Sequence, residues 1–308
     1  MLRVVTLGTS AAVPTPTRGL PAILIQYGHT NILLDCGEGT QLALMKGHFG
    51  MHNIEVIGIT HWHADHFSGL TGLTQTMGLD NREQSLTIGG PEGTEKAIQK
   101  LFSVGYGKVT YPIKTEDWQA GQMVFERSGR LNFSLKTFAT DHVVPSLGYI
   151  FEEGATWKVN KQKMEKLGLE ASPLIGKLKK GDSVSVDGRT IHPEDILERV
   201  PGRKILYTGD TTYSEHVIQA ARGADMLIHD ATFSEETKRD EYGHASAREA
   251  ALVAREAGVK QLVLVHIGRR YTKNVEPLER EARQIFKNTN VAADAAVYTI
   301  SIHRPEQE

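Results

Sequence analysis

The chain has 308 residues and a formal net charge of −2, from 35 basic and 37 acidic side chains, which excludes a polyanion binder that is basic along its whole length. Its single cysteine, Cys36, excludes an internal disulfide and a zinc site made of cysteines, and fits a reducing, cytoplasmic setting. The start, MLRVVTLGTS, has the pattern of a strand rather than of a signal peptide, and no run of about 18 apolar residues predicts a membrane-spanning helix. We therefore expect a cytoplasmic protein with no membrane partner.

The first half of the chain alternates predicted strands and helices. Apolar, β-branched runs predict strands, and apolar residues at helical spacing predict helices. The strands are expected over 2–8, 22–28, 31–36, 54–60 and 86–90. The helices are expected over 38–48, 68–79 and 93–104. Ser68 is the predicted N-cap of the second helix, and Pro91 and Gly93 mark the entry to the third.

The rest of the chain continues this alternation. Two strands are expected over 133–140 and 146–152, followed by four more at KILYTG, MLIHDAT, QLVLVHI and AAVYTI. Helices are expected near 214–222 and over 246–257 and 277–286. Apolar strands that each end in polar residues are typical of sheets buried between helices, so we expect the chemistry to collect at the strand ends.

One segment departs from this pattern. Residues 155–181 contain seven lysines and two glutamates, a local balance of +5 in a chain of −2. Such a run is commonly a solvated surface helix with a basic bias. The alternative is an excursion that binds a phosphate backbone. In that case the contacts would come from Lys158, Lys161, Lys163, Lys177, Lys179 and Lys180.

A loop rich in metal ligands lies between a predicted strand and a predicted helix. Residues 59–70 read ITHWHADHFSGL and contain three histidines and one aspartate within six residues. Imidazole nitrogens and carboxylate oxygens both suit zinc or a similar divalent ion. Four such residues in this spacing are rarely a chance pattern. With further ligands from elsewhere, they could hold two ions; they are His61, His63, Asp65 and His66.

Three more candidate ligands lie at or near the ends of other predicted strands. His142 follows the strand 133–140, Asp210 follows 204–208, and His266 lies in the strand LVLVHI. Taken singly, Asp210 could instead be the N-cap of the next helix, and His266 could be a packed core histidine. Together with the loop 59–70, they make seven ligands for one shared site.

The order of these ligands resembles the metallo-β-lactamase superfamily, through THWHADH and the three later residues. The resemblance implies an α/β fold, a four-layer αββα sandwich, with two zinc ions between its sheets. It implies that His61, His63 and His142 hold one ion, that Asp65, His66 and His266 hold the other, and that Asp210 bridges both. It covers nearly the whole chain, so we expect one domain over 1–308 with a basic insert at about 155–181.

Local motifs resemble one family of this superfamily, ribonuclease Z. They are LGTSAAVP at 7–14, LLDCGEGTQ at 33–41, HDAT at 229–232, HAS at 244–246, HIGRRY at 266–271 and AAD at 292–294. The resemblance implies an endonuclease that trims the 3′ ends of precursor tRNAs. It implies that the insert is a tRNA-binding arm, and that the protein is a homodimer in which the arm of one subunit holds RNA cut by the other.

Three departures from the family pattern stand out. The family often has HEAT where this chain has HDAT, so Asp230 keeps the carboxylate with one methylene fewer. The family often has glycine before the proline of the arm, where this chain has Ser172. Many members carry PxKxRN in a loop that contacts the tRNA 3′ end, and only Pro14 and Arg18 of it are present here. Arg18 is the predicted substrate contact, and the treatment of the CCA end is open.

Roles follow for the residues around the ions. A hydroxide between the ions would attack phosphorus, with Asp65 accepting the proton of the water. His244 would stabilise the departing 3′ oxygen, with Asp230 orienting its ring. The alternative for His244 is a capping role near Ser246. Asp35 is expected to orient the metal loop, and a phosphate contact is expected from Arg270, with Arg269 equally available.

Two rival functions remain at this stage. One is a small-molecule phosphodiesterase or related hydrolase of the same fold, which would share the metal site and need no basic arm. The other is a protein that binds metal or RNA without catalysis. Seven ligands and His244 exceed what a structural zinc site requires, because such sites usually close with four ligands.

Overall fold

The protein was examined as a computed structural model that describes residues 1–104, 109–129, 131–168, 173–179, 181–186, 188–238 and 240–302. The contacts divide the chain into two units. The larger unit comprises Met1–Glu152 and Lys204–Ser301. The smaller unit comprises Glu153–Arg203 and the chain from Ile302. No helix within the described ranges is long and apolar enough to cross a membrane.

The first sheet of the larger unit has seven strands in the order β18-β1-β2-β3-β4-β5-β6. Its strands β18, β1, β2 and β3 pair antiparallel, whereas β3, β4, β5 and β6 pair parallel. The strands are β1 (Leu2–Gly8), β2 (Ala22–Tyr27), β3 (Thr30–Leu34), β4 (Ile54–Gly58), β5 (Leu86–Gly90), β6 (Ile113–Asp117) and β18 (Ala296–Thr299).

The second sheet also has seven strands, in the order β17-β16-β15-β14-β9-β8-β7. Here β14, β15, β16 and β17 run parallel, and β9 pairs antiparallel with β14. The strands are β7 (Met123–Arg127), β8 (Phe133–Ala139), β9 (Leu147–Glu153), β14 (Lys204–Tyr207), β15 (Met226–Asp230), β16 (Leu262–Val265) and β17 (Thr289–Val291).

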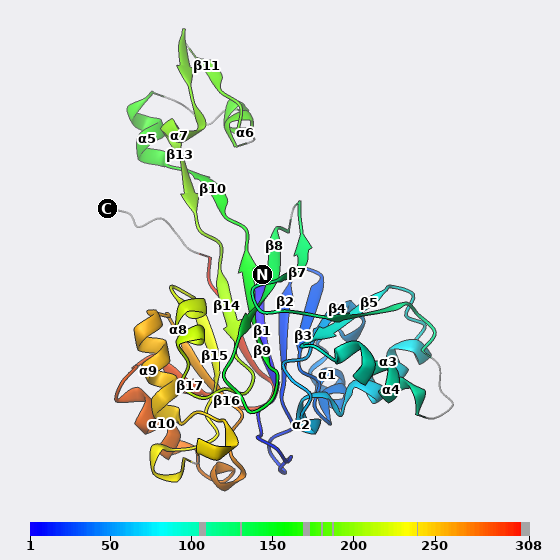
Figure 1. The fold of residues 1–308 in the computed structure, drawn as a ribbon. Coiled ribbons are helices and arrows are strands. Elements are labelled where there is room, and N and C mark those ends of the chain that lie inside the picture. Colours follow the sequence, from blue (N-terminus) through cyan, green and yellow to red (C-terminus); the bar gives the residue numbers. More distant parts are fainter. Residues whose placement is uncertain are drawn as a thin grey trace. The chain divides into compact units, whose positions relative to one another are not determined.

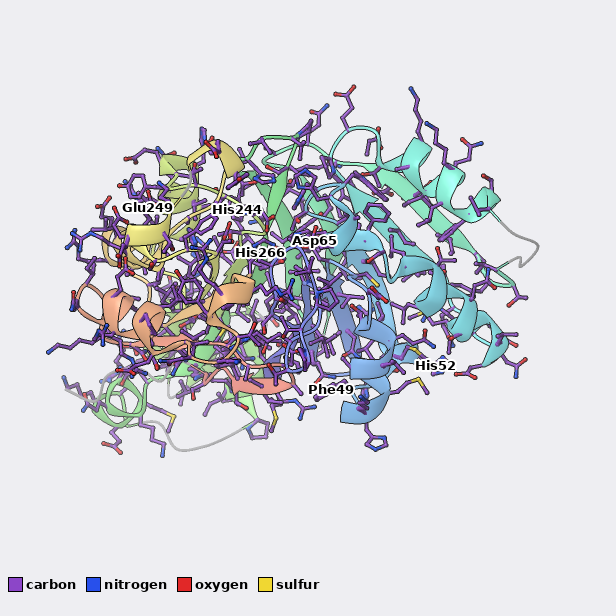
Figure 2. All side chains as sticks on the ribbon, turned by 90° about the horizontal axis from the view of Figure 1, so that it is seen from below. Phe49, His52, Asp65, His244, Glu249 and His266 are labelled. Carbon is purple, nitrogen blue, oxygen red and sulfur yellow. The ribbon has the colours of Figure 1, made fainter. Side chains whose placement is uncertain are left out.

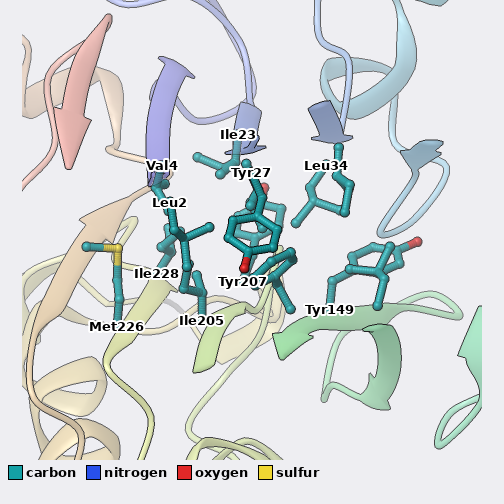
Figure 3. Close-up of a cluster of buried hydrophobic side chains, with 14 of the residues drawn as sticks. Leu2, Val4, Ile23, Tyr27, Leu34, Tyr149, Ile205, Tyr207, Met226 and Ile228 are labelled. Atoms are coloured by element: carbon teal, nitrogen blue, oxygen red, sulfur yellow. The ribbon is translucent and has the colours of Figure 1, made fainter. Parts of the chain in front are cut away.

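The two sheets face each other across a buried apolar core, to which Val4 and Ile23 of the first sheet and Ile205 and Ile228 of the second belong (Figure 3). Helices cover the outer face of each sheet (Figure 1). On the first sheet these are α1 (Thr40–Gly47), α3 (Leu70–Leu79) and α4 (Thr94–Ser103). On the second they are α8 (Glu215–Ala221), α9 (Ala247–Ala257) and α10 (Glu276–Arg283). The predicted four-layer αββα sandwich is confirmed.

Helix α9 shows how the local sequence makes these layers. Ser246 accepts a hydrogen bond from the Glu249 N–H, and the Glu249 side chain accepts from the Ser246 N–H, which is a capping box. Gly258 ends the helix in a left-handed conformation. Four alanines on one face of the helix are all buried against the second sheet: Ala247, Ala250, Ala251 and Ala254.

The polar residues collect where strands end. Asp35 follows β3, His61 follows β4, Asp210 follows β14 and His266 follows β16, and Asp230 is the last residue of β15. Asp35 and His266 have φ angles of +59° and +55°, so the backbone turns sharply as it leaves each strand. The prediction that the chemistry lies at the strand ends is confirmed.

Several boundaries differ from the prediction. Ser68 is not the N-cap of a helix, because the ligand loop forms the one-turn helix α2 (Ala64–Phe67) and α3 begins after Gly69. The Ser68 hydroxyl instead accepts a hydrogen bond from the Glu38 N–H at 3.0 Å. The prediction also missed β6, β7 and β17, which are all edge strands. Edge strands carry charged side chains and lack a clear apolar alternation.

The smaller unit has its own secondary structure and core. Strand β10 (Thr156–Val159) pairs with β13 (Leu197–Val200), and β11 (Val184–Val186) pairs with β12 (Arg189–Ile191). Its helices are α5 (Lys161–Lys166), α6 (Leu174–Leu178) and α7 (Pro193–Ile196). Its core contains Leu178, Val184, Ile191, Ile196 and Leu197. The reading of 155–181 as one solvated helix is therefore wrong, because the segment includes a strand and two short helices.

Candidate metal centre

Three histidine rings and one carboxylate converge near the ends of β4 and β14. His63 Nδ1 lies 2.9 Å from His61 Nε2 and 3.3 Å from His142 Nε2. Asp210 Oδ2 lies 3.6 Å from His61 Nε2. Three ring nitrogens and one carboxylate oxygen that face one point are a donor set that zinc takes in proteins. The three histidines are called the first cluster below.

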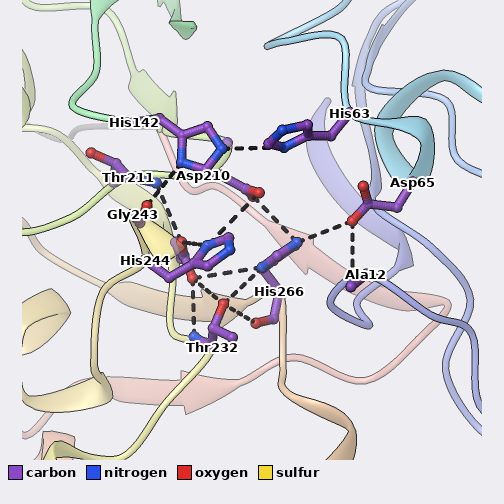
Figure 4. Close-up of polar contacts among 12 residues, drawn as sticks. Ala12, His63, Asp65, His142, Asp210, Thr211, Thr232, Gly243, His244 and His266 are labelled. Atoms are coloured by element: carbon purple, nitrogen blue, oxygen red, sulfur yellow. Dashed lines mark hydrogen bonds and ion pairs between the residues drawn. The ribbon is translucent and has the colours of Figure 1, made fainter. Parts of the chain in front are cut away.

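Asp65, His66 and His266 form a second cluster. Asp65 Oδ2 lies 3.6 Å from His66 Nε2 and 3.4 Å from His266 Nε2. Asp210 Oδ1 lies 3.3 Å from each of the same two nitrogens. Asp210 therefore directs one oxygen toward each cluster, and Figure 4 shows its side chain between His63 on one side and His266 on the other.

Hydrogen bonds on the far side of each ring determine which nitrogen faces the site. Asp35 accepts from His66 Nδ1 at 2.7 Å, and the Gly243 carbonyl accepts from His142 Nδ1 at 2.9 Å. The Thr232 hydroxyl donates to Asp230 at 2.7 Å and lies 2.8 Å from His266 Nδ1. Because the hydroxyl has one hydrogen and gives it to the carboxylate, His266 Nδ1 must donate to it. The Nε2 lone pair of each of these three rings is thus free for a metal.

Two buried atoms at this point have no hydrogen-bond partner. Of the four such side-chain atoms in the described part of the chain, two are His66 Nε2 and Asp210 Oδ1. An unsatisfied buried polar atom costs about 1–3 kcal/mol. A divalent ion in the second cluster would satisfy both atoms, because both are acceptors that face each other. The residues present therefore fit a metal ion at this position.

Asp230 is surrounded by donors and is not a suitable ligand, although Asp210, Asp230, His244 and His266 also form a group of potential ligands. Its Oδ1 accepts from the N–H and the hydroxyl of Thr232 at 3.0 and 2.7 Å. Its Oδ2 accepts from His244 Nδ1 at 2.8 Å. With both oxygens engaged, Asp230 orients His244 and leaves the other nitrogen of that ring, Nε2, for a substrate.

Burial and charge set the protonation of the site. Burial lowers the pKa of His61 to about 2, so the ring is neutral and can bind metal. Burial acts to raise the pKa of Asp65, but the hydrogen bond and charge of His266 lower it below the ordinary value. Burial acts to lower the pKa of His244, but the Asp230 carboxylate outweighs it and raises this pKa to about 9. His244 is therefore cationic at neutral pH, with a proton on each ring nitrogen.

The loop between β1 and β2 reaches the second cluster. The Ala12 N–H donates to Asp65 Oδ2 at 3.0 Å, with Ala12 at a φ of +58° (Figure 4). Arg18 donates to the Thr9 hydroxyl and the Ala292 carbonyl, and burial lowers its pKa. The guanidinium of Arg18 is thus bonded within the protein and ties this loop to the segment after β17. A substrate contact by Arg18 stays a prediction.

A cavity of about 530 Å³ lies beside the second cluster. The guanidinium carbon of Arg270 lies 5.8 Å from the centre of the Phe233 ring, a cation–π contact. This contact distinguishes the two arginines of HIGRRY, because it holds Arg270 in place at the cavity. The lining residues are Ala11, Ala12, Val13, Thr232, Phe233, Gly268, Arg269 and Arg270.

All seven ligands predicted from the sequence lie in or between the two clusters, and Figure 2 shows Asp65, His244 and His266 together between the helices of the two outer layers. The alternative capping roles are wrong: Ser214 caps α8 instead of Asp210, and Ser246 caps α9 instead of His244. The arm lysines lie in the smaller unit, except that Lys180 falls outside the described residues.

Of the residues that hold the ligands, Asp35 was predicted from the sequence, whereas Thr60 was missed. Thr60 donates its hydroxyl to Asp35 at 3.0 Å and contacts His61 Nδ1 at 3.1 Å. Thr232, which contacts His266, was also missed, as was Phe233, which contacts Arg270. A threonine directly before the first ligand and another in HDAT were the only signals, and threonine is common enough that neither could be singled out.

Family models match both halves of the chain. One, described as anti-Pycsar protein Apyc1, matches residues 2–167, and one described as a beta-lactamase superfamily domain matches residues 196–267. A ribonuclease Z of Archaeoglobus fulgidus is 43% identical over 301 residues, with 96% of each chain covered. The chain belongs to the ribonuclease Z family. A second ribonuclease Z, of Methanosarcina mazei, is 40% identical over 298 residues, again with 96% of each chain covered.

Solved structures agree with this family. The short form of human tRNase Z has a TM-score of 0.70 and 27% identity, and the match covers 97% of this chain and 100% of that one. The metallo-β-lactamase fold protein YhfI of Bacillus subtilis also has a TM-score of 0.70, with 22% identity and coverage of 96% and 98%. The second likeness supports the fold alone. The predicted metallo-β-lactamase fold and the predicted ribonuclease Z family are both confirmed.

Proposed function

We propose that this chain removes the 3′ trailer from precursor tRNA by hydrolysing one phosphodiester, with a 3′-hydroxyl left on the tRNA. As a member of the ribonuclease Z family it is a tRNA 3′-processing endonuclease with a His/Asp metal site. The observation that carries the finer proposal is the pair of clusters that share Asp210, with His244 beside them. This arrangement supplies donors for two ions and a separate proton donor.

The proposed metals are two zinc ions per subunit. Ring nitrogens make up five of the seven donor residues, and imidazole is a ligand that zinc prefers. The first ion would be held by His61, His63 and His142, the second by Asp65, His66 and His266, and both by Asp210. When bound, a metal pair lowers the pKa of a water and offsets the charge of the phosphate oxygens.

Asp65 and His244 are the proposed proton carriers of the reaction. Asp65 is ionised and can accept the proton of the attacking water as the new bond to phosphorus forms. His244 is protonated and can give its Nε2 proton to the 3′ oxygen as the bond between phosphorus and that oxygen breaks. Asp230 keeps the His244 ring oriented throughout. The trailer then leaves with a 5′ phosphate.

The cavity beside the second cluster is the proposed place for nucleotides next to the cut. It carries the cation of Arg270, stacked on Phe233, and it borders Thr232 and Ala12, which contact metal ligands. A guanidinium in that position suits a phosphate or the face of a base. We keep Arg270 as a substrate contact, and Arg18 with it.

The smaller unit is the proposed tRNA-binding arm of a single-domain protein over 1–308. Lys161, Lys163, Lys177 and Lys179 are exposed there, and Lys158 is half-buried. Lysine side chains in this density suit the phosphates of a folded RNA. We also propose a homodimer, in which the arm of one subunit holds the tRNA that the other subunit cuts.

A labelled precursor tRNA tests the proposed reaction. The protein should release a trailer and a mature tRNA that ends in a 3′-hydroxyl, as mapped on the products. Exhaustive chelation or the His63→Ala substitution should abolish cleavage, and added zinc should restore it only in the wild type. Full activity after chelation would contradict the metal proposal. Rapid turnover of small phosphodiesters with no cleavage of tRNA would favour the rival phosphodiesterase.

A further inference from the structure

The Asp35 carboxylate lies under the metal centre and accepts four hydrogen bonds. Asp35 is fully buried. Its Oδ1 accepts from the Thr60 N–H at 2.8 Å. Its Oδ2 accepts from the Thr60 hydroxyl at 3.0 Å, from His66 Nδ1 at 2.7 Å and from the Tyr207 hydroxyl at 2.7 Å. Three of these four donors come from the first sheet and its loop, and only Tyr207 comes from the second sheet.

Tyr207 crosses the core between the sheets to make this contact. It is the last residue of β14, its side chain is 2% exposed, and Figure 3 shows its ring among the apolar side chains of the core. Burial raises its pKa well above the ordinary value, so the phenol keeps its proton and donates it. A buried hydroxyl with this geometry serves a specific acceptor rather than solvent.

The end of β14 and the residues directly after it act on both sides of the His66 ring. Tyr207 acts on the Nδ1 side, because its hydroxyl shares Asp35 Oδ2 with His66 Nδ1. Asp210, three residues later, lies 3.3 Å from the Nε2 side. Residues at one strand end of the second sheet therefore position His66, a candidate ligand that belongs to the first sheet.

We infer that Tyr207 is a positioning residue for the second cluster, which orients His66 through Asp35 and so strengthens metal binding there. The inference rests on the metal assignment proposed above. Partners of ligating histidines typically contribute 10–100-fold to metal affinity. Tyr207 acts on His66 through Asp35 rather than directly. Tyr207→Phe should therefore weaken zinc binding by about 10-fold, at the lower end of that range.

Tyr149 provides a matched control for the loss of one hydroxyl. It pairs with Tyr207 across β9 and β14, it is 0% exposed, and it also reaches the first sheet. Its hydroxyl donates to the Ile59 carbonyl at 2.7 Å and has no hydrogen bond with Asp35. Tyr149→Phe thus removes the same atom from an equally buried ring and leaves the four donors of Asp35 in place.

Zinc titration against a competing chromophoric chelator tests the inference without RNA. Metal-free wild type should bind two zinc ions. Tyr207→Phe should bind one of them about 10-fold more weakly, with the other unchanged, whereas Tyr149→Phe should match the wild type at both sites. In a His266→Ala background, which lacks the second cluster, adding Tyr207→Phe should change nothing further. In the cobalt-substituted proteins, the absorption spectrum of Tyr207→Phe should differ from that of the wild type, whereas the spectrum of Tyr149→Phe should not.

Three outcomes separate the possible failures. Equal zinc affinities in Tyr207→Phe and wild type, or tighter binding in the variant, would overturn the inference while the metal assignment stands. The same loss in Tyr149→Phe would also overturn it, because a general loosening of the core would then explain the effect. A wild type that binds no zinc pair would overturn the metal assignment and the inference with it. Thermal unfolding of the two metal-free variants measures how much the loss of each hydroxyl lowers the stability of the fold.

Discussion

His244 is suited to proton donation by what its neighbours do to it. A histidine with an ordinary pKa of 6.5 would be mostly neutral at pH 7.5, and burial would make it more so. The Asp230 carboxylate at 2.8 Å reverses this and raises the pKa to about 9. Asp230 in turn is held by Thr232, which also contacts the ligand His266. His244, the proposed proton donor, and the metal centre therefore share one hydrogen-bonded network.

Replacing His244 by alanine should slow the chemical step and leave the metals in place. The ring belongs to neither cluster, so metal content should stay near that of the wild type. The rate should fall by about 10²–10⁴-fold, the usual contribution of a general acid. Single-turnover cleavage of a precursor tRNA and metal analysis of the same sample measure both. Loss of the metals, or an unchanged rate, would show that the role is wrong.

The Asp230→Asn substitution should shift the pH dependence of cleavage. In the wild type the raised pKa keeps His244 protonated below pH of about 9, and the donor is lost above it. Removing the negative charge lowers this pKa, so the alkaline fall in kcat should begin at a lower pH. The pH–rate profile of the zinc-saturated protein measures it. An alkaline limb that does not move would contradict the role of Asp230, and His244→Ala should lack this limb.

At the scale of elements, the ends of β4 and β14 meet at Gly209. Gly209 has a φ of +60°, and a Cβ on it would lie 2.7 Å from Cβ of Thr60. Thr60 immediately precedes His61, and Gly209 immediately precedes Asp210. Gly209 thus lies against the side chain of Thr60, with no room for a Cβ between the two strand ends. Any side chain at position 209 must push them apart.

Gly209→Ala should therefore weaken both zinc binding and stability. The left-handed backbone costs alanine about 1–2 kcal/mol, and the forced contact adds about 1–3 kcal/mol. Gly223 is the control, since its φ is +66° and a Cβ there would meet nothing within 4 Å. Gly223→Ala should lose stability from the backbone alone and keep its zinc affinity. Chemical denaturation and zinc titration of the two variants separate the contributions.

The basic arm gives a second prediction at this scale. Deleting the smaller unit between Glu153 and Arg203, with a short linker, should impair cleavage of precursor tRNA severely. Hydrolysis of bis(p-nitrophenyl) phosphate should persist, because this ester needs only the metals. Neutralising exposed lysines should flatten the salt dependence of RNA binding by about 0.7–0.9 in the log–log slope per lost contact. Equal losses on both substrates would mean that the segment only supports the fold.

For the whole molecule, the proposed dimer predicts that a chain without the arm and a His244→Ala chain should complement each other. A chain without the arm keeps its metal centre, and a His244→Ala chain keeps its arm. If the arm of one subunit serves the active site of the other, a heterodimer of the two has one working combination. Mixing them under conditions of subunit exchange should restore tRNA cleavage well above the sum of the separate activities. No gain on mixing, with exchange verified by mass, would contradict action between subunits.

The sequence by itself determined the ligand types, their order and the layers of the fold. The helical spacing of α9 and the apolar runs of the inner strands are local patterns, and they predicted the elements with few errors. The strand-end placement of Asp210 and His266 followed from the same patterns. The edge strands β6, β7 and β17, the one-turn helix α2 and the short elements of the smaller unit were missed, because short or charged segments carry too little periodic signal.

Only the tertiary structure decided how these residues act on one another. The contact of Tyr207 with Asp35 joins residues 172 positions apart, and that of His266 with Asp65 joins residues 201 apart. No local spacing encodes such contacts, because they arise where two sheets pack face to face. The same packing decided which oxygen of Asp210 faces which cluster. The pairing of β15 with β16 placed Arg270 on Phe233. The residue types determine which chemistry the site can perform, and the packing of the sheets determines the geometry of the site.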